Sequence, residues 1–320
     1  MTTLAPPAAT SAPAPRISGI GVLTGWGEGA SALPVPAGSA PTVAPPMLLT
    51  VPTPALDGER FRRATRECLL AVAAVRAALA DAGVDRAELA GPRTGMLYVT
   101  ATAYAAANRA FLEDEGSTTL HFPYTAPSAV PGEVTIEYGI RGPYVNLMGG
   151  APAALSGLWY AARWLADGLA DRVLVLAVET MHEVRDLLRP ARRLYRRPLV
   201  EGAACVLLEP GAGGELRWAT AALDGGGPAA AVTGVLDGVL GDAVPAVVGD
   251  GGGTHAVARA ERAALGRRGG APAVVGAPGE PLGCGPLLAL AGARTRGGGS
   301  ILLTGAWRNE YAALWWPATT

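Results

Sequence analysis

The stretch that decides the fold spans residues 125–168 and reads TAPSAVPGEVTIEYGIRGPYVNLMGGAPAALSGLWYAARWLADG. Its first part has a helical pattern, and the turn at Gly142 and Pro143 leads into an apolar strand at residues 144–148. The small residues Gly149 and Gly150 then end the strand, and a second helix is predicted at residues 153–169. The stretch therefore predicts a helix, a strand, a tight elbow and a helix, in that order.

Strand-length apolar runs alternate with helical patterns on both sides of this unit. Predicted strands lie at residues 17–23, 95–100, 172–179 and 203–209, and predicted helices at 58–82 and 105–115. The order recurs more weakly further on, with strands at 216–223, 246–249, 273–275, 300–304 and 311–315 and helices at 229–240, 256–265 and 286–293. This alternation predicts a mixed, buried sheet covered by helices, in a chain duplicated about residue 210.

Stretches rich in proline, alanine or glycine mark the boundaries of the predicted segments. Residues 1–15 are interrupted by proline and lack the apolar run of a signal peptide, so we expect a disordered tail. Residues 30–54 are expected to form a long irregular loop. We assign residues 16–210 to a first half and residues 211–320, after a glycine-rich turn, to a shortened second half.

Composition excludes several classes of protein. Half of the 320 residues are hydrophobic and 17% are charged, which is typical of a globular chain. All 26 basic residues are arginine, so neither a Schiff-base lysine nor a P-loop lysine is present. The net charge of −1 gives no reason to expect nucleic acid or an anionic membrane as a partner, and the longest apolar runs are too short to span one.

Cysteine and histidine are sparse. The three cysteines, Cys68, Cys205 and Cys284, are widely spaced, which argues against a disulfide framework or a zinc site and favours the cytoplasm. His121, His182 and His255 show no spacing typical of metal ligands. We therefore expect no metal and no bound cofactor.

The central stretch resembles the corresponding block of β-ketoacyl synthases. The flanking segments ISGIGVLTGWG, DRVLVLAVET and VEGAACVLLEP resemble the first strand, the strand after the elbow helix and the "GEGA" segment of that family. The resemblance covers most of residues 16–210 and, more weakly, residues 211–316. It implies an α/β, thiolase-like fold in which two pseudo-repeated βαβαβαββ halves form an α-β-α-β-α layered core.

The resemblance also implies that the catalytic residues are lost. The family's nucleophilic cysteine corresponds to Ala151, and its first histidine to Asp250 in GDGGGTHAVARAE. The second histidine corresponds to Cys284 or a neighbour in GEPLGCGPLLALAG, and no histidine follows His255. Condensation needs a thiolate and two imidazoles, so we expect this chain to be catalytically inactive within a ketosynthase (acyltransferase) complex.

Within the family, this pattern resembles the chain-length factors of type II polyketide synthases. Such subunits form a heterodimer, or a higher assembly, with an active β-ketoacyl synthase and shape its acyl tunnel. The short loops are similar to those of partners in highly reducing, polyene-making systems. Substrates would arrive on the phosphopantetheine of an acyl carrier protein. The bulky Trp307 and Arg308 stand where the family has a glycine-rich gating loop.

Two groups of residues are predicted to contact the substrate or the carrier. The helix at residues 105–115 occupies the place of the family's chain-length-controlling helix, and its candidates are Tyr104, Asn108, Phe111 and Leu112, for which core packing is the alternative. An arginine-rich run at residues 185–197 could contact the acidic carrier protein, although it could equally be a solvated face. Its candidate residues are Arg189, Arg192, Arg193, Arg196 and Arg197.

Two other functions remain open on sequence grounds. The chain could be a divergent acyl transferase or decarboxylase that uses Asp250, Cys284 or His255. It could also be a structural homodimer that acts as a scaffold for acyl carrier proteins. Turnover by the isolated chain would favour the first, and a filled rather than hollow interior near Phe111 would favour the second.

Overall fold

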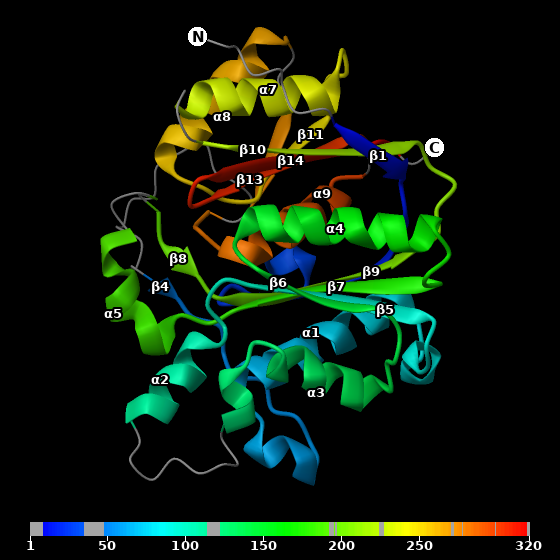
Figure 1. The fold of residues 1–320 in the computed structure, drawn as a ribbon, viewed down its shortest axis with the longest axis vertical. Coiled ribbons are helices and arrows are strands. Elements are labelled where there is room, and N and C mark those ends of the chain that lie inside the picture. Colours follow the sequence, from blue (N-terminus) through cyan, green and yellow to red (C-terminus); the bar gives the residue numbers. More distant parts are fainter. Residues whose placement is uncertain are drawn as a thin grey trace.

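Two six-stranded sheets enclose a central layer of helices, and further helices cover their outer faces (Figure 1). The computed structural model describes residues 9–34, 48–113, 122–191, 195, 197–223, 227–269, 272–276, 278–297 and 299–318. The resulting layers are helix, sheet, helix, sheet and helix, as the resemblance implied. Among the described residues, no helix is long and apolar enough to cross a membrane.

The first sheet has the strand order β3-β2-β9-β7-β5-β6. Its strands are β2 (Arg16–Thr24), β3 (Gly27–Glu28), β5 (Thr94–Thr100), β6 (Tyr144–Met148), β7 (Arg172–Glu179) and β9 (Gly202–Glu209). The inner strands are apolar almost throughout because both faces of the sheet are covered. β6 differs because it is the edge strand, and three of its five residues are exposed.

The second sheet repeats this arrangement in the order β1-β10-β14-β13-β11-β12. Its strands are β1 (Thr10–Pro13), β10 (Glu215–Ala222), β11 (Val247–Asp250), β12 (Ala273–Gly276), β13 (Ile301–Trp307) and β14 (Glu310–Trp316). In both sheets three antiparallel pairings are followed by two parallel ones. The five strands β2-β9-β7-β5-β6 and β10-β14-β13-β11-β12 occur in the same chain order, and only the edge strands β3 and β1 differ, since β3 follows β2 and β1 precedes β10. The predicted duplication is therefore present in the topology, while the boundary at residue 210 stays a prediction.

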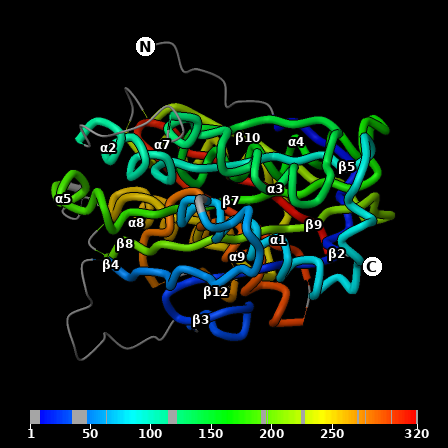
Figure 2. The backbone as a smooth tube through the Cα atoms, turned by 90° about the horizontal axis from the view of Figure 1, so that it is seen from below, coloured from blue at the N-terminus to red at the C-terminus, as the bar shows by residue number. Residues whose placement is uncertain are grey.

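The helices occupy equivalent places in the two halves. α4 (Ala151–Ala166) and α9 (Gly285–Arg294) lie between the sheets and carry much of the shared core. Outside the first sheet lie α1 (Arg66–Ala82) and α3 (Ala129–Tyr138), and outside the second lie α7 (Pro228–Leu240) and α8 (His255–Arg267). α2 (Ala105–Glu113) and α5 (Arg185–Leu188) lie together at one end of the molecule (Figures 1 and 2), where Arg109 and Asp186 form an ion pair of 2.8 Å.

Three sequence predictions are corrected by the structure. The predicted disordered tail is wrong for Thr10–Pro13, which form β1 because β10 offers them an antiparallel edge. The loop predicted at residues 30–54 includes β4 (Leu48–Leu49), which pairs with β8 (Leu199–Val200). The helix predicted from residue 58 begins at Arg66, since Glu59–Arg63 form a separate 3₁₀ turn that ends in extended backbone at Ala64.

The close packing of β2 on α1 gives a direct test of the fold. A Cβ atom added to Gly21 would lie 2.0 Å from the Ala74 carbonyl oxygen. We expect Gly21→Ala to lower the free energy of unfolding by about 2 kcal/mol or more, because backbone must move to admit the methyl group. Gly132→Ala is the matched control: it lies in α3 with no atom within 4 Å, and should raise stability by about 0.5–1 kcal/mol. Equal effects in urea unfolding would contradict this packing.

Candidate functional site

The elbow between β6 and α4 is closed at the position where the resemblance places the lost nucleophile. Ala151 begins α4 and is fully buried. Gly305 of β13 faces it so closely that a Cβ atom added there would lie 2.3 Å from the Ala151 Cβ. A methyl group therefore fills the space at the elbow, and no reactive group is present at this position.

Trp307 covers the elbow from the end of β13. A Cβ atom added to Gly150 would lie 2.9 Å from the Trp307 Cγ, so the side chain of Trp307 rests against the elbow backbone. The next residue, Arg308, has a φ angle of 53° in the turn between β13 and β14. Trp307, one of the two bulky residues at the position of the family's glycine-rich loop, thus lies against the elbow, and Arg308 follows it in the turn.

Asp250 lies in a partly buried ion-pair cluster at the end of β11. Arg197 forms ion pairs with Asp250 at 3.0 Å and with Glu280 at 3.2 Å, and it also donates to the carbonyl of Gly253. Burial raises the pKa of Glu280 to about 7, although Arg197 opposes this shift. Burial and the charge of Asp250 likewise raise the pKa of Glu261 to about 7. The position predicted for the first histidine is thus occupied by a carboxylate that is paired with arginine.

Cys284 is fully buried and lies within hydrogen-bonding distance (3.4 Å) of the carbonyl of Gly202. Burial raises the pKa of the Cys284 thiol well above its usual value, so the reactive thiolate is disfavoured. His255, the first residue of α8, is exposed, His182 lies in a 3₁₀ turn, and His121 lies outside the described residues. Among the described residues, no group of three or more histidine, cysteine, aspartate or glutamate side chains is placed to hold a metal ion.

Glu179, a residue not predicted from the sequence, fixes the loops around the elbow by hydrogen bonds. Its buried carboxylate accepts hydrogen bonds from the backbone of Ala101, Thr102 and Gly283 at 2.8–3.0 Å and from the Thr102 hydroxyl at 2.6 Å. Burial outweighs these bonds and raises the pKa of Glu179 to about 7. An acidic residue that directly follows the apolar run at residues 173–178 is the sequence signal that could have identified it.

Glu201 was also missed, and it anchors a second set of loops. Its carboxylate pairs with Arg66 at 2.6 Å and accepts hydrogen bonds from the backbone of Met181, His182 and Val51. Burial opposes ionisation, but the hydrogen bond from Arg66 and the other contacts hold the pKa of Glu201 below its usual value. The negative charge of Glu201 is therefore retained and paired inside the protein.

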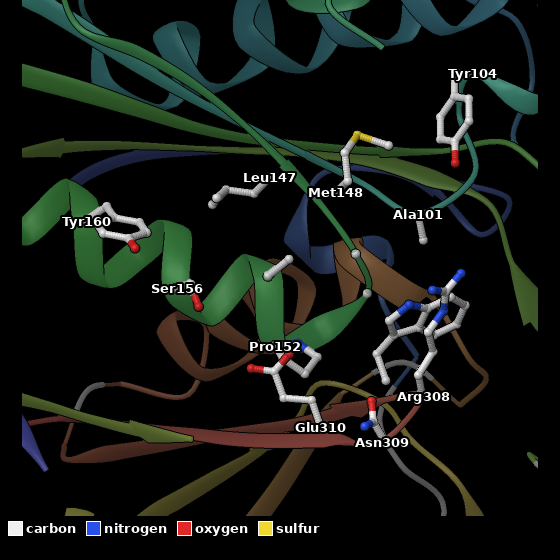
Figure 3. Close-up of a pocket in the computed structure, with 14 residues that line it drawn as sticks. Ala101, Tyr104, Leu147, Met148, Pro152, Ser156, Tyr160, Arg308, Asn309 and Glu310 are labelled. Atoms are coloured by element: carbon white, nitrogen blue, oxygen red, sulfur yellow. The ribbon is translucent and has the colours of Figure 1, made fainter. Parts of the chain in front are cut away.

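A pocket of about 520 Å³ lies beside the elbow (Figure 3). The end of β6, the elbow glycines and the first turns of α4 line it, together with Ala101, Tyr104 and residues 307–310. Ala151 does not line it. The pocket therefore adjoins the elbow without reaching the buried side chain of Ala151.

The four residues predicted for an acyl tunnel occupy different surroundings. Tyr104 lines the pocket. Asn108 instead donates from its side chain to the carbonyls of Tyr104 and Thr125, and the Phe111 ring packs against Phe122 with centroids 5.7 Å apart. Leu112 is 82% exposed. The structure thus brings only Tyr104 of the four to the pocket, and their role in a tunnel stays a prediction.

The arginine-rich run contains residues with different surroundings. Arg189 is exposed, as a contact with a carrier protein requires. Arg197 instead points inward to Asp250 and Glu280, and this placement replaces the surface role predicted for it. The ion pairs compensate carboxylates that burial would otherwise leave unpaired. The predicted contacts Arg192, Arg193 and Arg196 lie outside the described residues.

Comparison with known proteins finds similarity to ketosynthases in sequence and in fold. Residues 53–192 match the family model for the beta-ketoacyl synthase N-terminal domain. A granaticin polyketide putative beta-ketoacyl synthase 1 from Streptomyces violaceoruber is 31% identical over 131 residues, which are 37% of this chain and 31% of that protein. The match thus spans about a third of the length of that curated relative.

Two solved structures superimpose on nearly the whole chain. The ishigamide ketosynthase/chain length factor has a TM-score of 0.73 at 20% identity, covering 96% of this chain and 100% of the other. A type II polyketide synthase acyl-carrier protein in complex with its ketosynthase, AntDE:AntF, has a TM-score of 0.73 at 14% identity, covering 96% and 99%. The chain is therefore ketosynthase-like, resembles type II polyketide ketosynthase and chain-length-factor proteins, and has the predicted thiolase-like fold.

The raised carboxyl pKa values predict how stability depends on pH. Glu179, Glu261 and Glu280 each have a pKa of about 7 when folded, against an ordinary value of 4.5. The folded chain therefore binds more protons than the unfolded chain between about pH 4.5 and pH 7, and its free energy of unfolding should fall as pH rises through that window. Urea unfolding at several pH values measures this. Glu261→Gln should make the decline shallower, and a stability that rises from pH 5 to pH 7 would contradict the assignment.

Proposed function

We propose that this chain is a non-catalytic subunit of the chain-length-factor type, which pairs with an active β-ketoacyl synthase and shapes its acyl tunnel during polyketide synthesis. The observation that carries this proposal is the closed elbow: Ala151 is fully buried against Gly305, and Trp307 covers Gly150. Asp250 forms an ion pair with Arg197. The elbow position therefore holds no nucleophile, and the position of the first histidine holds a carboxylate that is already paired.

The edge of the first sheet supports pairing with another subunit. β6 exposes Tyr144, Val145 and Met148, and the adjacent Tyr160 of α4 is exposed as well. An apolar edge strand with unpaired backbone groups is an unstable surface in a monomer and a suitable one for an interface. The solved relative described as a ketosynthase/chain length factor makes an active synthase the favoured partner.

An acyl carrier protein is the second proposed partner, and phosphopantetheine thioesters are the proposed form of the substrate. The printed description of the AntDE:AntF complex, in which a carrier protein is bound to a ketosynthase, supports this choice. Of the predicted carrier contacts, exposed Arg189 is the described residue whose placement suits that role.

A stand-alone enzyme is the weaker candidate. Cys284 is buried with a raised thiol pKa, and Asp250 is paired with Arg197, so both lack the activation that a nucleophile or base requires.

A homodimeric scaffold for acyl carrier proteins would use the same β6 edge. Co-purification with a synthase distinguishes the proposed heterodimer from such a homodimer.

The interface assignment predicts the effect of a charge on β6. Val145→Arg should reduce co-purification of a co-expressed synthase by roughly tenfold or more, because an unpaired buried charge is strongly unfavourable at an interface. Leu187→Arg is the control, since Leu187 is 68% exposed on α5, away from β6. Tagged pull-down with densitometry measures both variants. If the Val145→Arg variant retained the synthase fully, β6 would not be part of the interface.

Restoring the thiol tests the closed elbow. We expect Ala151→Cys to remain inactive, because Gly305 blocks its side chain and no imidazole stands at Asp250 or Cys284 to activate it. The measurement is mass spectrometry of the intact variant after incubation with octanoyl-N-acetylcysteamine. Stoichiometric acylation of residue 151 would show that the elbow is open and would contradict this prediction.

A further inference from the structure

A second pocket, of about 650 Å³, lies where the chain crosses between the two sheets. The connections from β1 to β2 and from β9 to β10 line it, together with the end of α9, the start of β13 and the end of β14. The C-terminus lies at this end of the molecule, opposite α2 and α5 (Figures 1 and 2). The second pocket shares no residue with the pocket beside the elbow, so it is a separate cavity.

The second pocket opens between the two sheets, beyond the last turn of α9. Ile17 comes from β2 of the first sheet, and Ile301 and Trp316 come from paired positions on β13 and β14 of the second. All three belong to, or pack against, the core that fills the space between the sheets. Helix α9, which lies in this space, ends at Arg294. The sheets therefore face each other across a cavity at the end of α9.

The lining of the second pocket is apolar, and its charges are already paired. Apart from Arg16 and Arg294, every residue that lines it is apolar or glycine. Arg16 forms an ion pair with Glu209, and Arg294 forms one with Asp81. Because each guanidinium has a carboxylate partner, an anionic ligand would have to compete with that carboxylate. The pocket therefore suits an uncharged molecule.

Trp316 adds a hydrogen-bond donor to this apolar lining. The residue is 3% exposed, and its indole N–H forms no hydrogen bond with any residue that the structure describes. The indole nitrogen of Trp218 is completely covered by protein atoms, whereas that of Trp316 is not. Since Trp316 lines the second pocket, its N–H is open to a molecule bound there. A buried tryptophan N–H usually has an acceptor, and a ligand oxygen would supply one here.

We propose that the second pocket binds a neutral aromatic ketone, and that the indole N–H of Trp316 donates a hydrogen bond to its carbonyl oxygen. The volume of about 650 Å³ lies within the range of small-molecule sites. A space between two sheets and beside an indole ring favours a flat aromatic ligand. A pure hydrocarbon would leave the indole N–H without an acceptor. This site goes beyond the proposed function and does not depend on it.

Equilibrium dialysis of the full chain against three naphthalene probes tests the proposal. 2-Acetylnaphthalene carries the carbonyl oxygen, 2-ethylnaphthalene lacks it, and 2-naphthoate has a charged carboxylate in its place. We expect 2-acetylnaphthalene to bind roughly fivefold more tightly than 2-ethylnaphthalene, the difference that one neutral hydrogen bond makes, and more tightly than 2-naphthoate. Equal affinities for the two neutral probes would overturn the proposal, and so would tightest binding of 2-naphthoate. This comparison needs no variant.

Trp316→Phe tests the donor, because it removes the N–H and keeps an aromatic ring. It should lower the affinity for 2-acetylnaphthalene roughly fivefold, to that of 2-ethylnaphthalene. Trp315→Phe is the matched control: Trp315 is the neighbouring residue of β14, is 7% exposed and packs in the core on the opposite face of the second sheet. It should change neither affinity, and an equal loss in both variants would contradict the role of the Trp316 N–H.

Ala293→Leu tests the location. Ala293 lines the second pocket near the end of α9, and leucine adds three carbon atoms at that wall. We expect the added side chain to weaken binding of both neutral probes roughly tenfold or more, because it occupies space that the ligand needs. Unchanged affinities in a folded Ala293→Leu variant would show that the probes bind elsewhere, for example beside the elbow, and would overturn the assignment of this pocket.

Discussion

The buried carboxylate of Glu179 is the interaction on which the arrangement of the site depends. It ends the apolar strand β7 and accepts hydrogen bonds from the turn after β5 and from Gly283, ahead of α9 in the other half of the chain. Loops from both halves are thus fixed on one side chain, which positions Ala101 and Tyr104 beside the elbow. Burying a carboxyl group is unfavourable without such bonds, so these loops and the acid depend on each other.

The positions that the resemblance assigns to the catalytic residues are closed or paired in this structure. Ala151 packs against Gly305, Trp307 covers the elbow, and Arg197 reaches into the centre to pair with Asp250 and Glu280. Each of these contacts fills space or pairs a charge at the elbow and at the end of β11. A pocket lies beside this closed elbow.

The sequence predicts those parts of the fold in which the hydrophobic pattern of a segment matches the burial of that segment in the structure. β6 and β7 have the predicted bounds, because their apolar runs are delimited by turns and a sheet covered on both faces favours such runs. β1 was missed because four residues near prolines form a strand only through their long-range pairing with β10. Arg197 was placed on the surface because the charges of Asp250 and Glu280, distant in sequence, decide its direction. The spacing of Asn108 and Leu112 could not show that the first binds backbone and the second faces solvent.

The most direct test of the central claim, that this chain supports condensation without performing it, is mass spectrometry of carrier-bound products made by the chain co-expressed with its synthase. The account predicts equimolar co-purification and elongation that survives Cys284→Ala in this chain but is abolished when the cysteine of the synthase is replaced by alanine. Elongation or malonyl decarboxylation by this chain purified alone would contradict it.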